Sequence, residues 1–209
     1  MKKLWASLGL AFGTWLCAAP AASVPLVVRL DPALTTVAQS TAFMVDVKVS
    51  GLAPGQIITA FDLNVLFDSL ILTGVGAAEN ALVFSMPTFG PASVGIGNLG
   101  LEGLDFGTDA AIAPLQTAAE FVIASFSFMS NATDGFSLLT FGSSTPFESN
   151  IVGGDPYDTL SASFIGACVA VGTGQCRVPE PASYSLVGMA LAGMLVPGAL
   201  RRRKPKSLD

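Results

Sequence analysis

The chain of 209 residues contains no histidine. This absence excludes a Ser-His-Asp or Cys-His catalytic arrangement and any metal site with histidine ligands. Cysteine is scarce too: Cys17 lies in an N-terminal apolar segment, and the two that remain are too few for a zinc site made of thiolates. Trp5 and Trp15 lie in the same segment, so the rest of the chain lacks the flat indole rings on which sugars stack. The sequence therefore favours a non-catalytic protein without a metal or another cofactor.

Basic residues are also scarce between residues 24 and 177. Thirteen acidic residues stand there against Arg29, Lys48 and Arg177, which gives a net charge of −10. A body this acidic repels nucleic acid and anionic lipid, so we expect no nucleic-acid partner. Its length of about 150 residues suits one domain with its own core.

Residues 1–23 have the pattern of a secretory signal peptide. A short basic start is followed by an apolar run over residues 4–18 and by small residues at positions that a signal peptidase reads. We expect cleavage and export, with the domain over residues 24–177 in an oxidising compartment.

Cys168 and Cys176 are predicted to form a disulfide in that compartment. Residues 165–171 alternate like a strand, and the glycine-rich residues 172–174 permit a tight reversal. A returning segment would then bring the two sulfur atoms together across a hairpin at the end of the domain.

Residues 178–209 hold three ordered elements. Residues 182–200 carry no charge, and a helix of nineteen residues covers about 28 Å, close to the hydrocarbon thickness of a bilayer. A proline-rich spacer precedes this run and a basic cluster follows it: Pro179, Glu180 and Pro181, then Arg201, Arg202, Arg203 and Lys204. The positive-inside rule places the basic end in the cytoplasm and all that precedes the helix outside.

This order of elements resembles the PEP-CTERM sorting signal of Gram-negative bacteria that make exopolysaccharide. The resemblance implies that an exosortase-type enzyme reads the motif and processes the chain. It also implies a precursor held in the inner membrane by the helix, and a mature protein at the cell surface or in the extracellular matrix. An ordinary C-terminal anchor with a proline-rich stem is the alternative interpretation.

Alternation of apolar and polar residues dominates residues 24–177, clearest over residues 43–50, 61–68 and 121–128. In the last of these, one face is expected to hold Val122, Ala124, Phe126 and Phe128. Shorter strands are predicted at residues 26–30, 81–84, 94–96, 136–141 and 160–171. Many strands with regular turns and no helical period indicate an all-β antiparallel sandwich.

Residues 45–52 and 60–68 resemble the opening of cohesin-type domains, where a strand that ends in a glycine turn leads into an Ala-Phe strand that ends in Phe-Asp. The strand at 120–128, with its Phe-x-Phe end, is similar to a later strand of that family. The resemblance implies a jelly-roll sandwich of about nine strands, related to carbohydrate-binding modules. Ser69 stands where the family usually has proline, and the chain has no dockerin calcium loop.

Two acidic clusters are candidate sites, because glycoside hydrolysis needs two facing carboxylates. The clusters are Glu102, Asp105 and Asp109, and Asp155 and Asp158. Both lie in turn-like sequence, where aspartates commonly cap their own backbone, and neither has the spacing of a calcium loop. Solvated turns are the favoured interpretation and calcium the alternative. Asp155, Tyr157 and Asp158 form a candidate contact loop.

The sequence thus predicts an exported, exosortase-sorted, non-catalytic protein of the cell surface or exopolysaccharide matrix with a structural or adhesive β-sandwich. The alternative is a binding module that recognises a polysaccharide or another surface protein through one sheet face.

Overall fold

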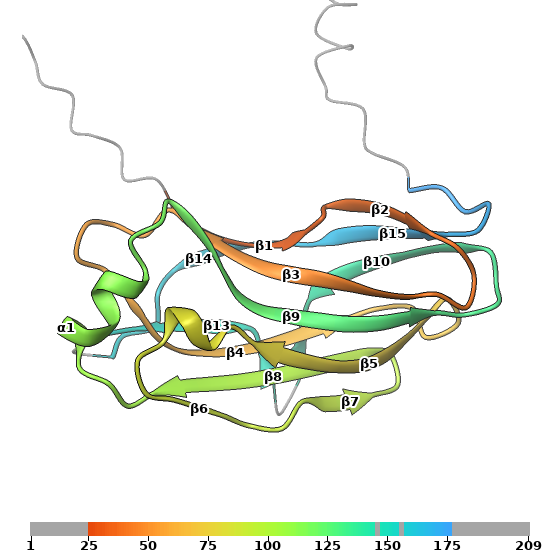
Figure 1. Cartoon of the computed structure of the whole chain (residues 1–209). Helices are drawn as coiled ribbons and strands as arrows, with labels where there is room; N and C mark the ends of the chain where they lie inside the picture. The colour runs from red at the N-terminus through yellow and green to blue at the C-terminus, as the bar shows by residue number, and fades with distance from the viewer. Residues whose placement is uncertain (1–24, 145–146, 155–156, 177–209) are drawn as a thin grey trace, which may run out of the picture.

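Two β-sheets face each other in the computed structural model, which describes residues 25–144, 147–154 and 157–176 (Figure 1). The expected signal peptide at residues 1–23 and the sorting segment at residues 178–209 lie outside the described residues. Within the described part, no helix is long and apolar enough to cross a membrane.

The first sheet has five strands, with the long antiparallel pair β3 and β9 at its centre. In spatial order the strands are β14 (Ala162–Ile165), β1 (Leu26–Asp31), β3 (Ala42–Ser50), β9 (Glu120–Ser130) and β5 (Leu72–Glu79).

The second sheet has eight strands. Six follow one another as β2 (Leu34–Val37), β15 (Ala167–Val171), β10 (Gly135–Phe141), β4 (Ile58–Leu66), β8 (Asn98–Asp105) and β6 (Pro87–Phe89). Two short strands join them: β13 (Asn150–Gly153) pairs with β4, and β7 (Ser93–Gly95) pairs with β8. The remaining elements are the pair β11 (Ser143–Ser144) and β12 (Phe147–Glu148) and the short helices η1 (Ala81–Val83), α1 (Asp109–Ile112) and η2 (Ala113–Leu115).

The chain changes sheets twice along one edge of the sandwich. It passes from β1 to β2 across the cis Asp31–Pro32 peptide bond, and from β14 to β15 at Gly166. A side chain at Gly166 would start 2.2 Å from the Leu139 carbonyl oxygen, so only glycine fits there. The pairs β1–β14 and β2–β15 are parallel, which corrects the expectation of a purely antiparallel sandwich.

Phenylalanine rings join the two sheets in the core. Phe128 of the five-stranded sheet stacks on Phe43 at 5.6 Å and meets Phe67, just after β4, edge-on at 5.4 Å. The alternating residues of β3, β4 and β9 supply most of the buried apolar surface around them. The strands expected at residues 43–50, 61–68 and 121–128 are therefore confirmed, as is the all-β class.

A β-bulge changes which residues of β9 face the core. Lys48 pairs with Val122 and Val47 with Ala124, so Ile123 is an extra residue in the strand. Ile123 is fully buried, whereas Val122 is only partly buried. The expectation that Val122 shares the inner face with Ala124 is wrong, because the bulge shifts the alternation by one residue.

Two of the shorter predicted strands need correction. At residues 81–84 the chain forms the 3-10 helix η1 over residues 81–83 instead of a strand, since the Asn80 side chain accepts a hydrogen bond from the Leu82 amide and caps the turn. The strand predicted at residues 160–171 is divided at Gly166 into β14 and β15. The other predicted short strands correspond to β1, β7 and β10.

We predict that Phe126→Ala lowers the free energy of unfolding by about 3–5 kcal/mol, because Phe126 is 0% exposed and its loss leaves a cavity in the core. Phe136→Ala is the control, since that ring is 50% exposed and its removal should cost less than about 1 kcal/mol. Urea denaturation of both variants measures the difference. Equal losses would contradict the assignment of the inner faces.

Candidate partner-binding surface

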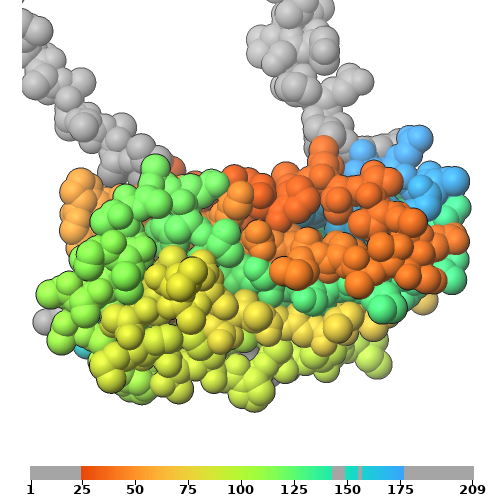
Figure 2. All heavy atoms as spheres, in the orientation of Figure 1, coloured from red at the N-terminus to blue at the C-terminus, as the bar shows by residue number. Residues whose placement is uncertain are grey.

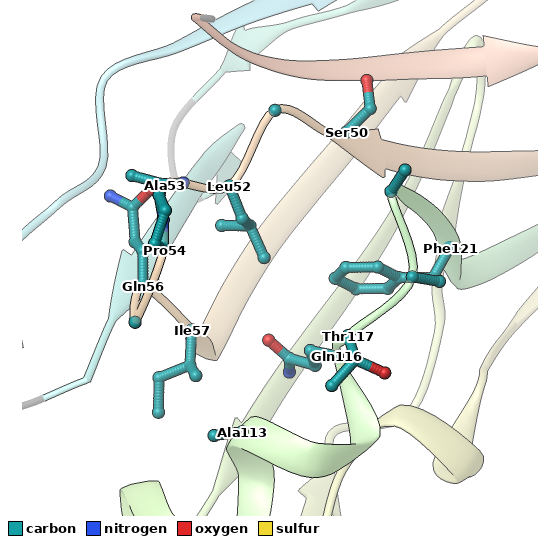
Figure 3. Close-up of a pocket in the computed structure, with 14 residues that line it drawn as sticks. Ser50, Leu52, Ala53, Pro54, Gln56, Ile57, Ala113, Gln116, Thr117 and Phe121 are labelled. Atoms are coloured by element: carbon teal, nitrogen blue, oxygen red, sulfur yellow. Dashed lines mark hydrogen bonds between the residues drawn. The ribbon is translucent and has the colours of Figure 1, made fainter. Parts of the chain in front are cut away.

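A cavity of about 590 Å³ opens at one end of the sandwich, between residues 51–57 and 113–121 (Figure 3). No charged side chain lines it. The Gln116 amide at its wall is already engaged: its oxygen accepts from the Ile58 amide at 2.8 Å, and its nitrogen donates to the carbonyls of Ile58 and Val83. The cavity thus offers apolar surface but no side chain able to serve as a general acid or base.

The outer face of the five-stranded sheet carries a cluster of four charged residues. Arg29 holds Glu120 in a two-pronged contact, with Nη2 at 2.9 Å and Nε at 3.1 Å from Oε2, and donates to Asp31 at 2.8 Å. Lys48 Nζ lies 2.6 Å from the other Asp31 oxygen. Every ion pair among the described residues belongs to this cluster, and its four charges sum to zero.

The hydrogen bonds of this cluster favour the charged forms of Arg29, Asp31 and Lys48. Bonding to Glu120, and then to Asp31, raises the pKa of the Arg29 guanidinium. The bond between Lys48 and Asp31 raises the pKa of the ammonium and lowers the pKa of the carboxyl. The members of this cluster therefore neutralise one another. Asp46 of β3, which lies opposite Asp31 and accepts a hydrogen bond from the Ser125 hydroxyl, adds one further carboxylate to the same face.

The outer face of the eight-stranded sheet carries a shallow hollow of about 290 Å³, which we call the acidic hollow. Its lining comes from β4, β8, β6 and β13 and from one nearby loop: Ala60, Phe61, Asp62, Thr88, Gly90, Glu102, Gly103, Leu104 and Asn150. Asp62 and Glu102 are direct cross-strand neighbours in the β4–β8 register. Arg29 and Lys48, the two cations of the described residues, both lie in the cluster on the other sheet.

An exposed apolar side chain accompanies these two carboxylates. Leu104, two residues after Glu102 on β8, projects to the same side and is 40% exposed. The hollow thus combines negative charge with apolar surface, which are the two features that a basic, amphipathic segment of another protein would complement.

The structure separates the first acidic cluster of the sequence. Glu102 lies in the acidic hollow, whereas Asp105 is buried and accepts hydrogen bonds from the amides of Gly107 at 2.7 Å and Met86 at 2.9 Å, and from Ser85. Burial acts to raise the pKa of Asp105, but these bonds outweigh it and hold the pKa below its ordinary value. Asp105 caps backbone amides, as the turn interpretation expected, but it lies buried at the end of β8 and not in a solvated turn.

Asp109, the third member of that cluster, lies near the second one. Its carboxylate lies against Gly154, and with Asp158 it lines a small cavity of about 180 Å³. Among the described residues, no group of three or more potential ligands is placed to hold a metal ion.

The candidate contact loop is described only in part. Tyr157 is exposed and adopts the left-handed backbone region with φ of 64°, and Asp158 is exposed beside it. Asp155 lies outside the described residues. The loop remains a prediction.

The predicted disulfide between Cys168 and Cys176 is present, with their Cα atoms 5.9 Å apart. Residues 172–176 contain no returning strand, so the bond closes a loop rather than the expected hairpin. The loop crosses the end of β15, and its Thr173 hydroxyl donates to Asp134 at 2.6 Å. Both ties fasten the last described residues to the sandwich.

No protein-family model matches the chain, and no curated protein matches it in sequence. Solved cohesins share its fold. The sixth cohesin of scaffoldin B from Acetivibrio cellulolyticus, solved in complex with a dockerin, is 14% identical with a TM-score of 0.53, over 71% of this chain and 100% of that one.

Two further similar structures are cohesins from an archaeon and from a glycoside hydrolase. A non-cellulosomal cohesin from the hyperthermophilic archaeon Archaeoglobus fulgidus is 11% identical, with a TM-score of 0.53 over 72% of this chain and 93% of that one. The cohesin module of a Clostridium perfringens family 33 glycoside hydrolase is 9% identical, with a TM-score of 0.53 over 72% and 97%. The chain therefore has a cohesin-like fold, as the resemblance at residues 45–52 and 60–68 implied.

We predict that Asp105→Asn destabilises the domain by about 1–3 kcal/mol at neutral pH, because an amide brings hydrogens toward backbone donors that need an acceptor. The pKa of folded Asp105 is depressed, so its contribution is complete above the unfolded value of 3.8 and is lost as the pH falls toward the folded pKa.

Urea denaturation at neutral pH and near pH 3 tests both parts of this expectation. The stability gap between wild type and Asp105→Asn should narrow in acid. Asp158→Asn, at an exposed aspartate, is the control and should change little. A gap that widens in acid would show that the carboxylate is not the favoured form.

Proposed function

We propose that the chain is an exported, non-catalytic binding module that recognises a basic segment of a partner protein through the acidic hollow. The observation that carries this proposal is the directly opposed pair Asp62 and Glu102 beside the exposed Leu104, on the sheet without the charge-neutralising cluster. A positively charged partner would complement the negative charge that these side chains give the hollow.

The fold supports a protein partner over a small substrate. Several of the similar cohesins were solved in complex with dockerins, so this type of sandwich serves elsewhere to hold another protein. The chemistry of the hollow calls for a partner segment with cationic side chains, which would contact Asp62 and Glu102. The same segment would need an apolar side chain to contact Leu104.

We further propose that the module acts at the cell surface or in the extracellular matrix, after an exosortase-type enzyme has processed its C-terminal segment. The support is the order of Pro179-Glu180-Pro181, the uncharged run at residues 182–200 and the arginines from Arg201 to Arg203. In this view the C-terminal segment determines location and the sandwich determines binding.

Reversing one charge in the hollow should abolish capture of the partner. Immobilised wild-type protein is incubated with envelope and secreted proteins from the cells that produce it, and bound proteins are quantified by mass spectrometry. Glu102→Lys should reduce retention of the partner by about tenfold or more, because the new ammonium group would repel the cationic side chains of the partner.

Glu79→Lys makes the same change of net charge at the end of β5 on the other sheet, and should retain the partner as well as wild type does. Equal capture by all three proteins would overturn the hollow as the binding site. Capture of polysaccharide, with no protein lost in the Glu102→Lys sample, would favour the carbohydrate-binding alternative instead.

The sorting proposal predicts that Glu180→Ala leaves export and membrane insertion intact but blocks processing, because the signal peptide and the apolar run are unchanged. Mass spectrometry of the mature C-terminus measures the outcome. Identical C-termini in wild type and variant would reduce residues 178–209 to a plain anchor.

A further inference from the structure

The two edges of the sandwich are formed by different parts of the chain. The first and last described strands, β1 with β14 and β2 with β15, form one edge, whereas β5 and the short strands β6 and β7 form the opposite edge. In the space-filling view the orange residues of the first strands and the yellow to lime residues of β5 to β7 lie at opposite edges (Figure 2). The second edge is therefore clear of both ends of the described chain.

An uncharged cleft of about 470 Å³ opens on this second edge, between β5 and the turn that joins β7 to β8. It reaches the core, since its lining includes Phe67, Leu72 and Gly74. A side chain at Gly74 would start 3.3 Å from the Phe67 ring, so this glycine keeps the floor of the cleft open.

A fully exposed isoleucine stands at the rim of the same cleft. Ile96 is 95% exposed at the tip of the turn, followed by Gly97 with φ of 76°. The turn geometry requires glycine at position 97 but places no demand for an apolar residue at position 96. Val94, on the other side of the tip, is also more than half exposed. Ile96 and Val94 thus add exposed apolar surface to the rim of the uncharged cleft.

We propose that this edge pairs with the same edge of a second copy, with Ile96 of each copy seated in the cleft of the other. The exposed Ile96 side chain and the cleft that it borders lie on one patch, as a two-fold interface requires, since the same surface then serves both partners. The patch is also a place where two strongly acidic copies can meet without opposing carboxylates, because no charged residue lines the cleft.

The pairing has a geometric consequence for the chain ends. Because the cleft lies on the edge opposite β15, Cys176, the last described residue, lies on the side of each copy that faces away from the interface. Two copies would thus link objects on opposite sides of the dimer rather than sit side by side on one surface.

Sedimentation velocity of the full chain in mild detergent, over a range of protein concentrations, tests the pairing. The wild type should shift reversibly from monomer to dimer as concentration rises. Ile96→Asp should raise the dissociation constant by about tenfold or more, since it buries a charge in the apolar cleft. Leu82→Asp is the matched control, because Leu82 is 82% exposed on η1 and does not line the cleft.

A wild type that stays monomeric at every concentration, or equal effects of the two aspartates, would overturn the pairing. Ile96→Ser serves as a second variant if the aspartate disturbs folding, and it should also weaken the dimer. Glu102→Lys should leave the dimer unchanged, and Ile96→Asp should leave capture of the basic partner unchanged. Failure of one proposal is therefore distinguishable from failure of the other.

Discussion

The burial of the two inner sheet faces against each other is the constraint on which the rest of this structure depends. The pair β3–β9 supplies one side, with Phe128 at its centre, and β4 with β8 supplies the other, with Phe67 meeting Phe128 edge-on just after β4. Because these inner faces are buried in the core, only the outer faces, the edges and the loops at the ends of the sandwich are accessible to other molecules. The cavity at one end of the sandwich has no charged lining, so the charged side chains that could contact a partner lie on the outer faces and edges.

Charge distinguishes the two outer faces. The described part of the chain has two cations, Arg29 and Lys48, and both are engaged with Asp31 and Glu120 on the five-stranded sheet. Neither of these two cations lines the acidic hollow. Surface ion pairs contribute little to stability individually, so the main consequence of the cluster is for the distribution of charge over the surface.

The sequence was sufficient where alternation was strict, because a half-buried strand imposes period two on its residues, as at 43–50. It was insufficient at residues 81–84, where a short apolar run fits a helix or a strand equally and the capping Asn80 was the signal available. The bulge at Ile123 depends on the partner strand and leaves no local mark. The acidic hollow depends on the register between Asp62 and Glu102, forty residues apart, which no pattern in one strand reveals.

The central claim is that a partner protein binds over the acidic hollow rather than over the outer face of the five-stranded sheet. A photo-reactive phenylalanine placed at Thr88, in the lining of the hollow, should cross-link to the captured partner. The same group at Met44, exposed on β3 of the five-stranded sheet, should give no such product. Cross-linking from Met44 without cross-linking from Thr88 would contradict the account.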